Sequence, residues 1–329
     1  MAIENKLSTV SEIVRRVVSE SYGIDGVLTR LPGENLNFLV ETQNGRKWVA
    51  KIAGKDQGTK FVEMEHAALR WAGEAKLGLA LPHIIENIYG KLETRIVLHN
   101  KSSNRLRINE YISGINWSDY PDISIKMRFD LGAVLARFDL AMLGFDHPQA
   151  HRKHRWDLAD AGQHQAKVNL VQEPEKRQLL AWAFAQWTNF ASPFLAALPW
   201  QFIHGDGNPE NIRVVDGQVI GLLDFGDSCF NPAVCELAIC LAYQMMNQAD
   251  PWAVARSIID GYESLRPLST QEKALLEPLV CGRLAASLSV ATERRRIDQG
   301  NANWFVSETP AWSLLARLRA SAVSFFTNA

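Results

Sequence analysis

The sequence predicts an α+β protein with two lobes, in which an antiparallel sheet lobe with one helix precedes a mainly helical lobe. The chain has 329 residues, which is longer than one ordinary domain. Short alternating or β-branched segments occupy residues 36–111, and long helical runs follow Gly114. We therefore expect residues 1–112 to form the first lobe and residues 113–329 to form the second.

The first lobe begins with residues 1–23, where apolar residues at helical spacing predict a surface helix. Four later segments are typical of strands and are separated by turns such as Asn44-Gly45: LNFLVET, RKWVAKIA, TRIVLH and RLRINEY. One helical segment, FVEMEHAALRWAGEA, interrupts them. Its apolar face contains Phe61, Ala68, Leu69 and Ala72.

The second lobe is expected to be mainly helical. A strand ends at EYISG, residues 110–114, and this short connection could act as a hinge. Helical patterns then cover residues 123–143, 155–172, 175–197, 233–247, 252–265 and 270–291.

Composition limits the partners of the protein. Hydrophobic residues make up 47% and charged residues 22%, and the formal net charge is -1. Such a balance provides no basic field for nucleic acid or an anionic membrane. The best membrane candidate, AVCELAICLAY, is interrupted by Glu236, so we expect a soluble protein. Four cysteines without a CxxC pair predict buried thiols in a reducing, cytoplasmic compartment. Oligomerisation is not indicated.

The most informative stretch is QFIHGDGNPENIRVVDGQVIGLLDFGD, residues 201–227. Its segments IRVV and QVIGLL are joined by Asp216-Gly217, a dipeptide that favours a two-residue hairpin turn. Counting from this turn places Val215 opposite Gln218 and Asn211 opposite Leu222. We therefore expect Asn211 and Asp224 to meet at the open end of the hairpin.

The spacing H-G-D-x-x-x-x-N, followed thirteen residues later by D-F-G, matches the catalytic loop and metal-binding turn of kinases. In that arrangement Asp206 accepts the hydroxyl proton or orients the nucleophile. Asn211 and Asp224 would hold Mg²⁺, which takes few protein ligands and keeps positions for phosphate oxygens. The alternative is that all three are ordinary turn residues beside a hairpin.

A kinase also needs a cation on the phosphates and an acid that positions it. WVAKIA provides Lys51 on a predicted strand. Glu65 on the following helix is its expected partner, with Glu63 as the alternative. The loop LPGENLNF, residues 31–38, has one glycine, so backbone N–H groups and Asn37 would have to cover the phosphates. AGKDQGTK, residues 53–60, does not match the order of a P-loop.

These residues resemble the aminoglycoside phosphotransferase-like family, the small-molecule relatives of protein kinases that include choline, homoserine and hydroxylysine kinases. The motifs HGDGNPEN, LLDFGDSCFNPAVCELAICLAYQMM and RWDLADA are most similar to the hydroxylysine kinase branch. The resemblance implies a protein-kinase-like fold with ATP or GTP between the lobes. It also implies that the base lies on EYISG, where Glu110 and Ile112 would bind it.

Two features argue against a protein substrate. About eight residues separate Asp224 from the next predicted helix, without an A-P-E element, which leaves no room for an activation segment. Gly205 also replaces the arginine of H-R-D.

Glu236 stands where many relatives have aspartate, and we expect it to support the catalytic loop.

The acceptor site is less clearly indicated. Asp227 could bind an ammonium group or cap the next helix. Asp157 and Trp156 could bind the acceptor, although a helix cap and a core aromatic are favoured. Any of Arg152, Arg155 and Arg283 could bind a carboxylate. A metal site at His147, His151 and His154 is disfavoured against a solvated basic face, because Arg152, Lys153 and Arg155 surround them.

The sequence therefore predicts a kinase that phosphorylates the hydroxyl of a small metabolite. A hydroxylated amino acid or amino alcohol such as hydroxylysine is the first choice of acceptor. Homoserine, choline, ethanolamine and an aminoglycoside are the alternatives. A catalytically silent nucleotide-binding regulator is the alternative from another class.

Overall fold

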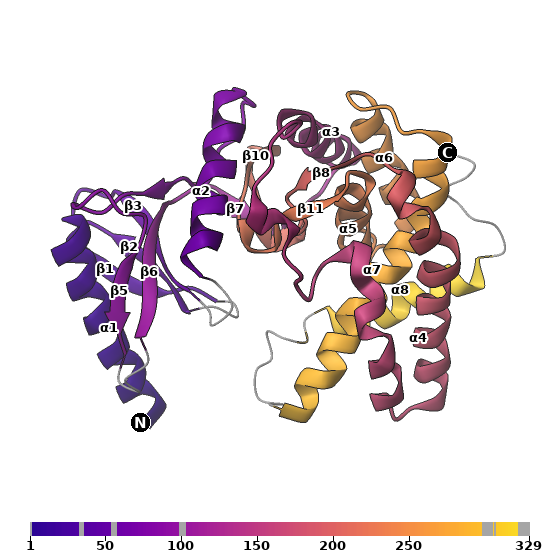
Figure 1. The fold of residues 1–329 in the computed structure, drawn as a ribbon, viewed down its shortest axis with the longest axis horizontal. Coiled ribbons are helices and arrows are strands. Elements are labelled where there is room, and N and C mark those ends of the chain that lie inside the picture. The colour runs from indigo at the N-terminus through magenta and orange to yellow at the C-terminus, as the bar shows by residue number, and fades with distance from the viewer. Residues whose placement is uncertain are drawn as a thin grey trace. The chain divides into compact units, whose positions relative to one another are not determined.

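The structure is a computed structural model that describes residues 2–32, 36–53, 58–98, 103–297, 305 and 307–321, with the side chains of residues 2–9 excepted. It divides into two compact units (Figure 1). The sheet unit comprises residues 1–70 and 81–113, and the helical unit comprises residues 71–80 and 114–329.

An antiparallel sheet forms most of the sheet unit. Its strands are β1 (Val27–Arg30), β2 (Leu36–Glu41), β3 (Lys47–Ile52), β4 (Ile84–Ile85), β5 (Thr94–Val97) and β6 (Ser103–Glu110). The spatial order is β1-β2-β3-β6-β4, and β5 also pairs with β6. The four strands expected from the sequence correspond to β2, β3, β5 and β6, whereas the short β1 and β4 were not predicted.

Helix α1 (Ala2–Tyr22) lies along the sheet in Figure 1 and covers its apolar face. Val14 and Val18 of α1 are fully buried against strand residues such as Phe38 and Ile108. The expected surface helix is thus an amphipathic helix that completes the core. Helix α2 (Thr59–Glu74) buries its predicted face, since Phe61, Ala68, Leu69 and Ala72 are at most 3% exposed.

The helical unit is built from α3 (Ile125–Ala141), α4 (Pro174–Gln186), α5 (Val234–Gln244), α6 (Pro251–Glu263), α7 (Thr270–Ile297) and α8 (Glu308–Ala320). Helices α3 and α6 cross closely, because a Cβ at Gly132 would lie 1.9 Å from the Ile258 carbonyl oxygen. The expected helix over residues 155–172 is instead the 3₁₀ segment η3 (Leu158–Leu170), which is kinked at Asp160. The expected helix over residues 175–197 continues from α4 into η4 (Trp187–Ala191, a π turn) and η5 (Ser192–Ala197).

Short strands and 3₁₀ turns complete this unit. They are β7 (Ile115–Asn116), η1 (Trp117–Asp119), η2 (Pro148–His151), β8 (Trp200–Ile203), η6 (Pro209–Asn211), β9 (Ile212–Val215), β10 (Gln218–Leu222), η7 (Phe225–Asp227) and β11 (Cys229–Pro232). Strand β9 lies between β10 and β7, and β8 pairs with β11. These strands frame the loop that carries the HGD motif.

Helix α7 is the most apolar long helix in the described part of the chain. Its best window has a mean hydropathy of 1.4, which by length and composition alone would suit a membrane span. However, 83% of that window is buried inside the protein, which identifies α7 as a core helix. The sequence prediction had considered only the apolar segment that became α5.

Candidate active site

The sheet unit carries a row of polar side chains on the face opposite α1. Asn37 on β2 pairs in register with Lys51 on β3, and Lys51 pairs with Arg107 on β6. Paired residues of antiparallel strands point to the same face, so these three side chains lie in one row. The register thus brings together Asn37 and Lys51, the two residues expected to contact phosphate.

Glu65 reaches this row from α2 and is fully buried, whereas Glu63 is exposed. Its Oε2 atom lies 2.7 Å from Nη2 of Arg107, whose side chain is 2% exposed. The sequence analysis expected Glu65 to pair with Lys51, which stays a prediction, and it did not identify Arg107 as a partner. Buried polar atoms without hydrogen-bond partners among the described residues include Asn37 Oδ1, Arg107 Nε and Arg107 Nη1. The two arginine nitrogens are donors and fit a site that an anionic ligand completes, whereas the Asn37 oxygen is an acceptor and needs a donor.

Glu110 and Ile112, the residues expected to bind the base, lie at the end of β6. The Glu110 N–H donates to the His83 carbonyl oxygen at 2.8 Å, and Ile112 is buried. Residues 33–35 of the expected phosphate-covering loop and residues 54–57 of the rejected P-loop segment lie outside the described residues.

The HGD loop of the helical unit follows β8 and is held by buried groups. His204 is fully buried; its Nε2 atom lies 2.8 Å from the Leu223 carbonyl oxygen, and its Nδ1 accepts from the Asp206 N–H at 3.3 Å. The Gly205 N–H donates to Glu236 Oε2 at 3.1 Å. Glu236 therefore supports the loop backbone, which confirms the role expected for it.

Asp206 presents a carboxylate that is held on both oxygens. Its Oδ2 accepts from the side-chain amides of Asn208 at 2.9 Å and Asn211 at 2.7 Å. Its Oδ1 lies 3.2 Å from Nη2 of Arg283. Burial raises the pKa of Asp206, and the positive charge of Arg283 opposes this shift. The contacts with Asn208, Asn211 and Arg283 orient the carboxylate, while 16% of the Asp206 side chain stays exposed.

The hairpin of β9 and β10 differs from the expected register by one residue. Asp216 and Gly217 both have positive φ, as predicted for the tight turn. A β-bulge at Ile220 follows, so Leu222 pairs with Ile212 and not with Asn211. The Asn211 carbonyl instead accepts from the Leu223 N–H at 2.8 Å. Asn211 and the residue before Asp224 therefore still meet at the open end.

Asn211 and Asp224, the residues expected to hold Mg²⁺, carry oxygen donors of the kind that suits a hard cation. The Asn211 amide nitrogen donates to Asp206, so its amide oxygen is the group that can coordinate a metal. Asp224 adopts a left-handed backbone, with φ of 57°. An amide oxygen and one carboxylate fit Mg²⁺, which leaves most of its coordination to water and phosphate. Among the described residues no cluster of three His, Cys, Asp or Glu side chains forms an all-protein metal site.

Asp227 lies near two other acidic side chains of the site, Asp206 and Asp224. Burial, followed by the negative charge of Asp206, raises its pKa to about 8. The alternative that it caps the next helix is wrong, because β11 separates it from α5. Arg152 binds the backbone here, donating to the carbonyl oxygens of Gly226 at 2.9 Å and Ser228 at 2.7 Å.

The other acceptor candidates occupy different positions. Asp157 caps η3 by accepting from the Ala159 N–H at 3.0 Å, and the same oxygen accepts from Asn231 at 2.8 Å. Trp156 lies against Arg283, with the guanidinium carbon 5.0 Å from the ring centroid. Of the three arginines left open by the sequence, Arg283 therefore contacts both Trp156 and Asp206.

The expectation of a solvated face at the three histidines is wrong for His154. Both of its ring nitrogens are buried and lack hydrogen-bond partners within the described part of the chain. Burial, followed by the charges of Arg152 and Arg283, lowers its pKa to about 3. His151 is exposed and lies 2.6 Å from Asp146.

The four cysteines are buried and free, as predicted.

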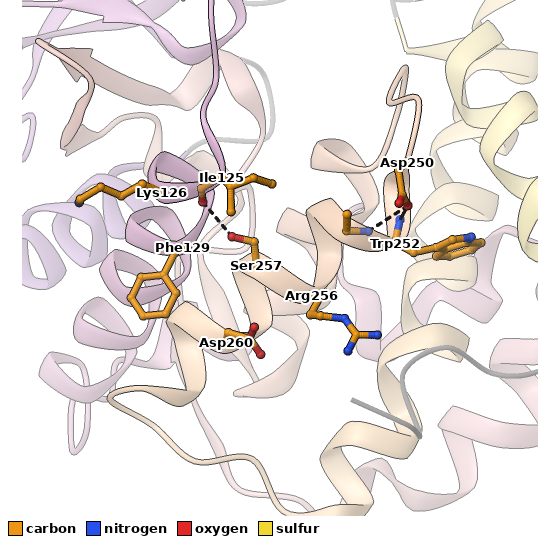
Figure 2. A pocket seen from close by; sticks show the side chains of 9 residues that line it. Ile125, Lys126, Phe129, Asp250, Trp252, Arg256, Ser257 and Asp260 are labelled. Atoms are coloured by element: carbon orange, nitrogen blue, oxygen red, sulfur yellow. Dashed lines mark hydrogen bonds between the residues drawn. The ribbon is translucent and has the colours of Figure 1, made fainter.

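A separate pocket lies between the N-terminal end of α3 and the stretch from Asp250, the N-cap of α6, to Asp260 (Figure 2). It has a volume of about 690 Å³. Its lining includes Phe129, Trp252 and Arg256, and the Ser257 hydroxyl donates to the Ile125 carbonyl at 2.8 Å beside it. None of the predicted site residues lines this pocket.

Comparison with known proteins agrees with this arrangement. The sequence model of the phosphotransferase enzyme family, APH, matches residues 27–268. Hydroxylysine kinase from Mus musculus is 28% identical over 311 residues, covering 87% of this chain and 82% of the relative. Homoserine kinase from Gluconobacter oxydans (strain 621H) is 33% identical over 255 residues, covering 75% of each chain.

Solved structures share the fold. A microcompartment-associated aminopropanol kinase aligns with a TM-score of 0.76 at 16% identity, covering 94% of this chain and 97% of its own. Amicoumacin kinase in complex with AMP-PNP, Ca²⁺ and Ami aligns with a TM-score of 0.73 at 14% identity over the whole of both chains. The predicted kinase-like fold and family resemblance are confirmed. The chain belongs to the APH phosphotransferase enzyme family and is a phosphotransferase whose acceptor is the hydroxyl of a small molecule.

Proposed function

We propose that the protein transfers the γ-phosphate of ATP, with Mg²⁺, to the hydroxyl of a small hydroxylated amino acid or amino alcohol such as hydroxylysine. The observation that carries the proposal is the Asp206 carboxylate, oriented by the amides of Asn208 and Asn211 and kept partly exposed. A carboxylate held in this way can accept a hydrogen bond from an alcohol and later its proton.

The other predicted residues receive roles in the same reaction. Lys51 and Asn37 would contact the phosphates, and Glu65 would order the row through Arg107. Backbone groups of Glu110 and Ile112 would bind the base. Asn211 and Asp224 would hold Mg²⁺, which supplies positive charge that stabilises the transferring phosphoryl group. GTP is the alternative nucleotide.

The acceptor class is inferred from the charges beside Asp206. Asp227 offers a carboxyl group whose ionisation a bound ammonium ion would favour, and the ring of Trp156 lies against Arg283, the partner of Asp206. The similarity to hydroxylysine and homoserine kinases supports an amino-acid acceptor. Four buried, free thiols agree with a reducing, cytoplasmic location.

The test is nucleotide consumption with Mg²⁺ across hydroxylysine, homoserine, choline, ethanolamine and an aminoglycoside, using ATP and GTP in parallel. We expect acceptor-dependent turnover with ATP, highest for hydroxylysine. Asp206→Asn should lower kcat by about 10²- to 10⁴-fold. Asp216→Asn is the matched control, because Asp216 is a turn residue whose positive φ suits asparagine. Equal rates in Asp206→Asn and wild type would contradict the proposed role.

A further inference from the structure

Arg283 is a buried cation in an otherwise apolar stretch of α7. Its neighbours Cys281, Gly282, Leu284 and Ala285 are buried, and the arginine is itself 2% exposed. An isolated buried charge is strongly unfavourable, so such a group is retained only with partners that compensate it. The partners of Arg283 therefore indicate what its charge is used for.

Those partners come from three separate segments. Nη1 donates to the Trp156 carbonyl oxygen at 3.2 Å, and Nη2 donates to the Tyr243 hydroxyl at 3.0 Å and to Asp206 Oδ1 at 3.2 Å. The guanidinium carbon also lies 5.0 Å from the Trp156 ring centroid and 5.3 Å from that of Tyr243. Two aromatic rings and two neutral acceptors thus fix the direction in which the guanidinium meets Asp206.

The contact fixes one particular oxygen of the carboxylate. Oδ2 already accepts from Asn208 and Asn211, whereas Oδ1 has Arg283 as its side-chain donor. A carboxylate oxygen accepts about two hydrogen bonds, so Oδ1 keeps a lone pair for an acceptor hydroxyl. The position of that lone pair is set by Arg283.

We propose that Arg283 is a positioning residue for phosphoryl transfer. Its guanidinium, held by contacts with the rings of Trp156 and Tyr243, orients Oδ1 of Asp206 toward the acceptor hydroxyl. The inference rests on the proposed function of Asp206. It assigns Arg283 to the transfer step and not to the binding of an acceptor carboxylate. The two roles predict different kinetics, because a lost orientation lowers kcat whereas a lost acceptor contact raises KM for the acceptor.

The experiment compares Arg283→Met and Arg283→Lys with Arg266→Met as the matched control. Arg266 is also a poorly exposed arginine that is ion-paired, at 2.7 Å to Glu272, and stacked, at 5.6 Å over Tyr262. We expect kcat to fall about 10²-fold in Arg283→Met, with KM for nucleotide and acceptor unchanged. Arg283→Lys should be similarly impaired, since an ammonium cannot keep the planar geometry. Unfolding midpoints of all variants show whether stability alone accounts for the change.

Chemical rescue separates orientation from folding. Added guanidinium at low concentration should restore part of the turnover of Arg283→Ala and none of that of Asp206→Ala. The proposal is overturned if acceptor KM rises while kcat holds, if Arg266→Met loses as much kcat, or if guanidinium does not restore turnover. Slow hydrolysis of ATP by water is followed in the same variants. Failure of every acceptor would then count against the proposed acceptor class, while the hydrolysis rates still decide the role of Arg283.

Discussion

Two carboxylates, one in each unit, are held in opposite ways. Glu65 in the sheet unit is completely buried, and its close contact is the guanidinium of Arg107. Asp206 in the helical unit is held by two neutral amides and one cation, and 16% of its side chain remains exposed. A closed ion pair fixes structure, whereas a carboxylate with an open lone pair can exchange a hydrogen bond with a substrate.

The largest expected effect is a loss of stability in the sheet unit when the cation that pairs with Glu65 is removed. Arg107→Met removes this cationic partner from the buried Glu65 carboxylate, which should lower the free energy of unfolding by about 3–5 kcal/mol. Equilibrium denaturation with urea measures the change. The exposed pair of Lys126 and Asp130, at 2.5 Å, is the control, and Lys126→Met should change stability by less than about 1 kcal/mol. Equal effects in both variants would show that the buried pair has no special role.

A smaller effect is expected from two glycines that both have positive φ. A Cβ at Gly205, where φ is 75°, would lie 2.9 Å from the Asp227 carbonyl oxygen. Gly205→Ala should cost about 1–3 kcal/mol through backbone strain, and should also reduce kcat by moving Asp206. At Gly217, with φ of 73°, the nearest atom to a Cβ is the Tyr120 hydroxyl at 3.5 Å. Gly217→Ala should cost about 1 kcal/mol and leave kcat unchanged, as thermal unfolding and steady-state rates will test.

The smallest effect at neutral pH is expected at His154. Its pKa is lowered from 6.5 to about 3, chiefly by burial. Between these values the unfolded chain binds a proton that the folded chain does not, so this contribution to stability is lost as the pH falls through that window. In His154→Gln the free energy of unfolding should therefore decrease less between pH 6.5 and pH 3. Parallel curves for wild type and variant would contradict the buried, neutral imidazole.

The part of the site that the sequence predicted is the part that is contiguous along the chain. His204 to Asp227 fold as one loop, hairpin and turn, so spacing alone indicated the neighbours of Asp206 and Asn211. The sheet that carries Lys51 followed from its alternating pattern. Local patterns encode such features because the residues concerned are close in sequence.

The partners that were missed are assembled by tertiary packing. Arg283 reaches Asp206 across 77 positions, and Arg107 meets Glu65 through the register of β6 against β3. No spacing rule selects one arginine among several at such separations. The bulge at Ile220 did have a signal, since Gly221 interrupts a strand pattern and isolated strand glycines favour bulges.

That bulge has a consequence for the length of the hairpin. Its extra residue is anchored, because the Ile220 carbonyl accepts from the Ala80 N–H at 2.7 Å. Successive side chains of a strand alternate between faces, so deleting one residue from β10 (Gln218–Leu222) would turn over the later side chains of that strand and change how the chain reaches Asp224. We therefore expect that inserting or deleting two residues in β10 displaces Asp224 less than inserting or deleting one, because a change of two residues keeps the alternation of side chains.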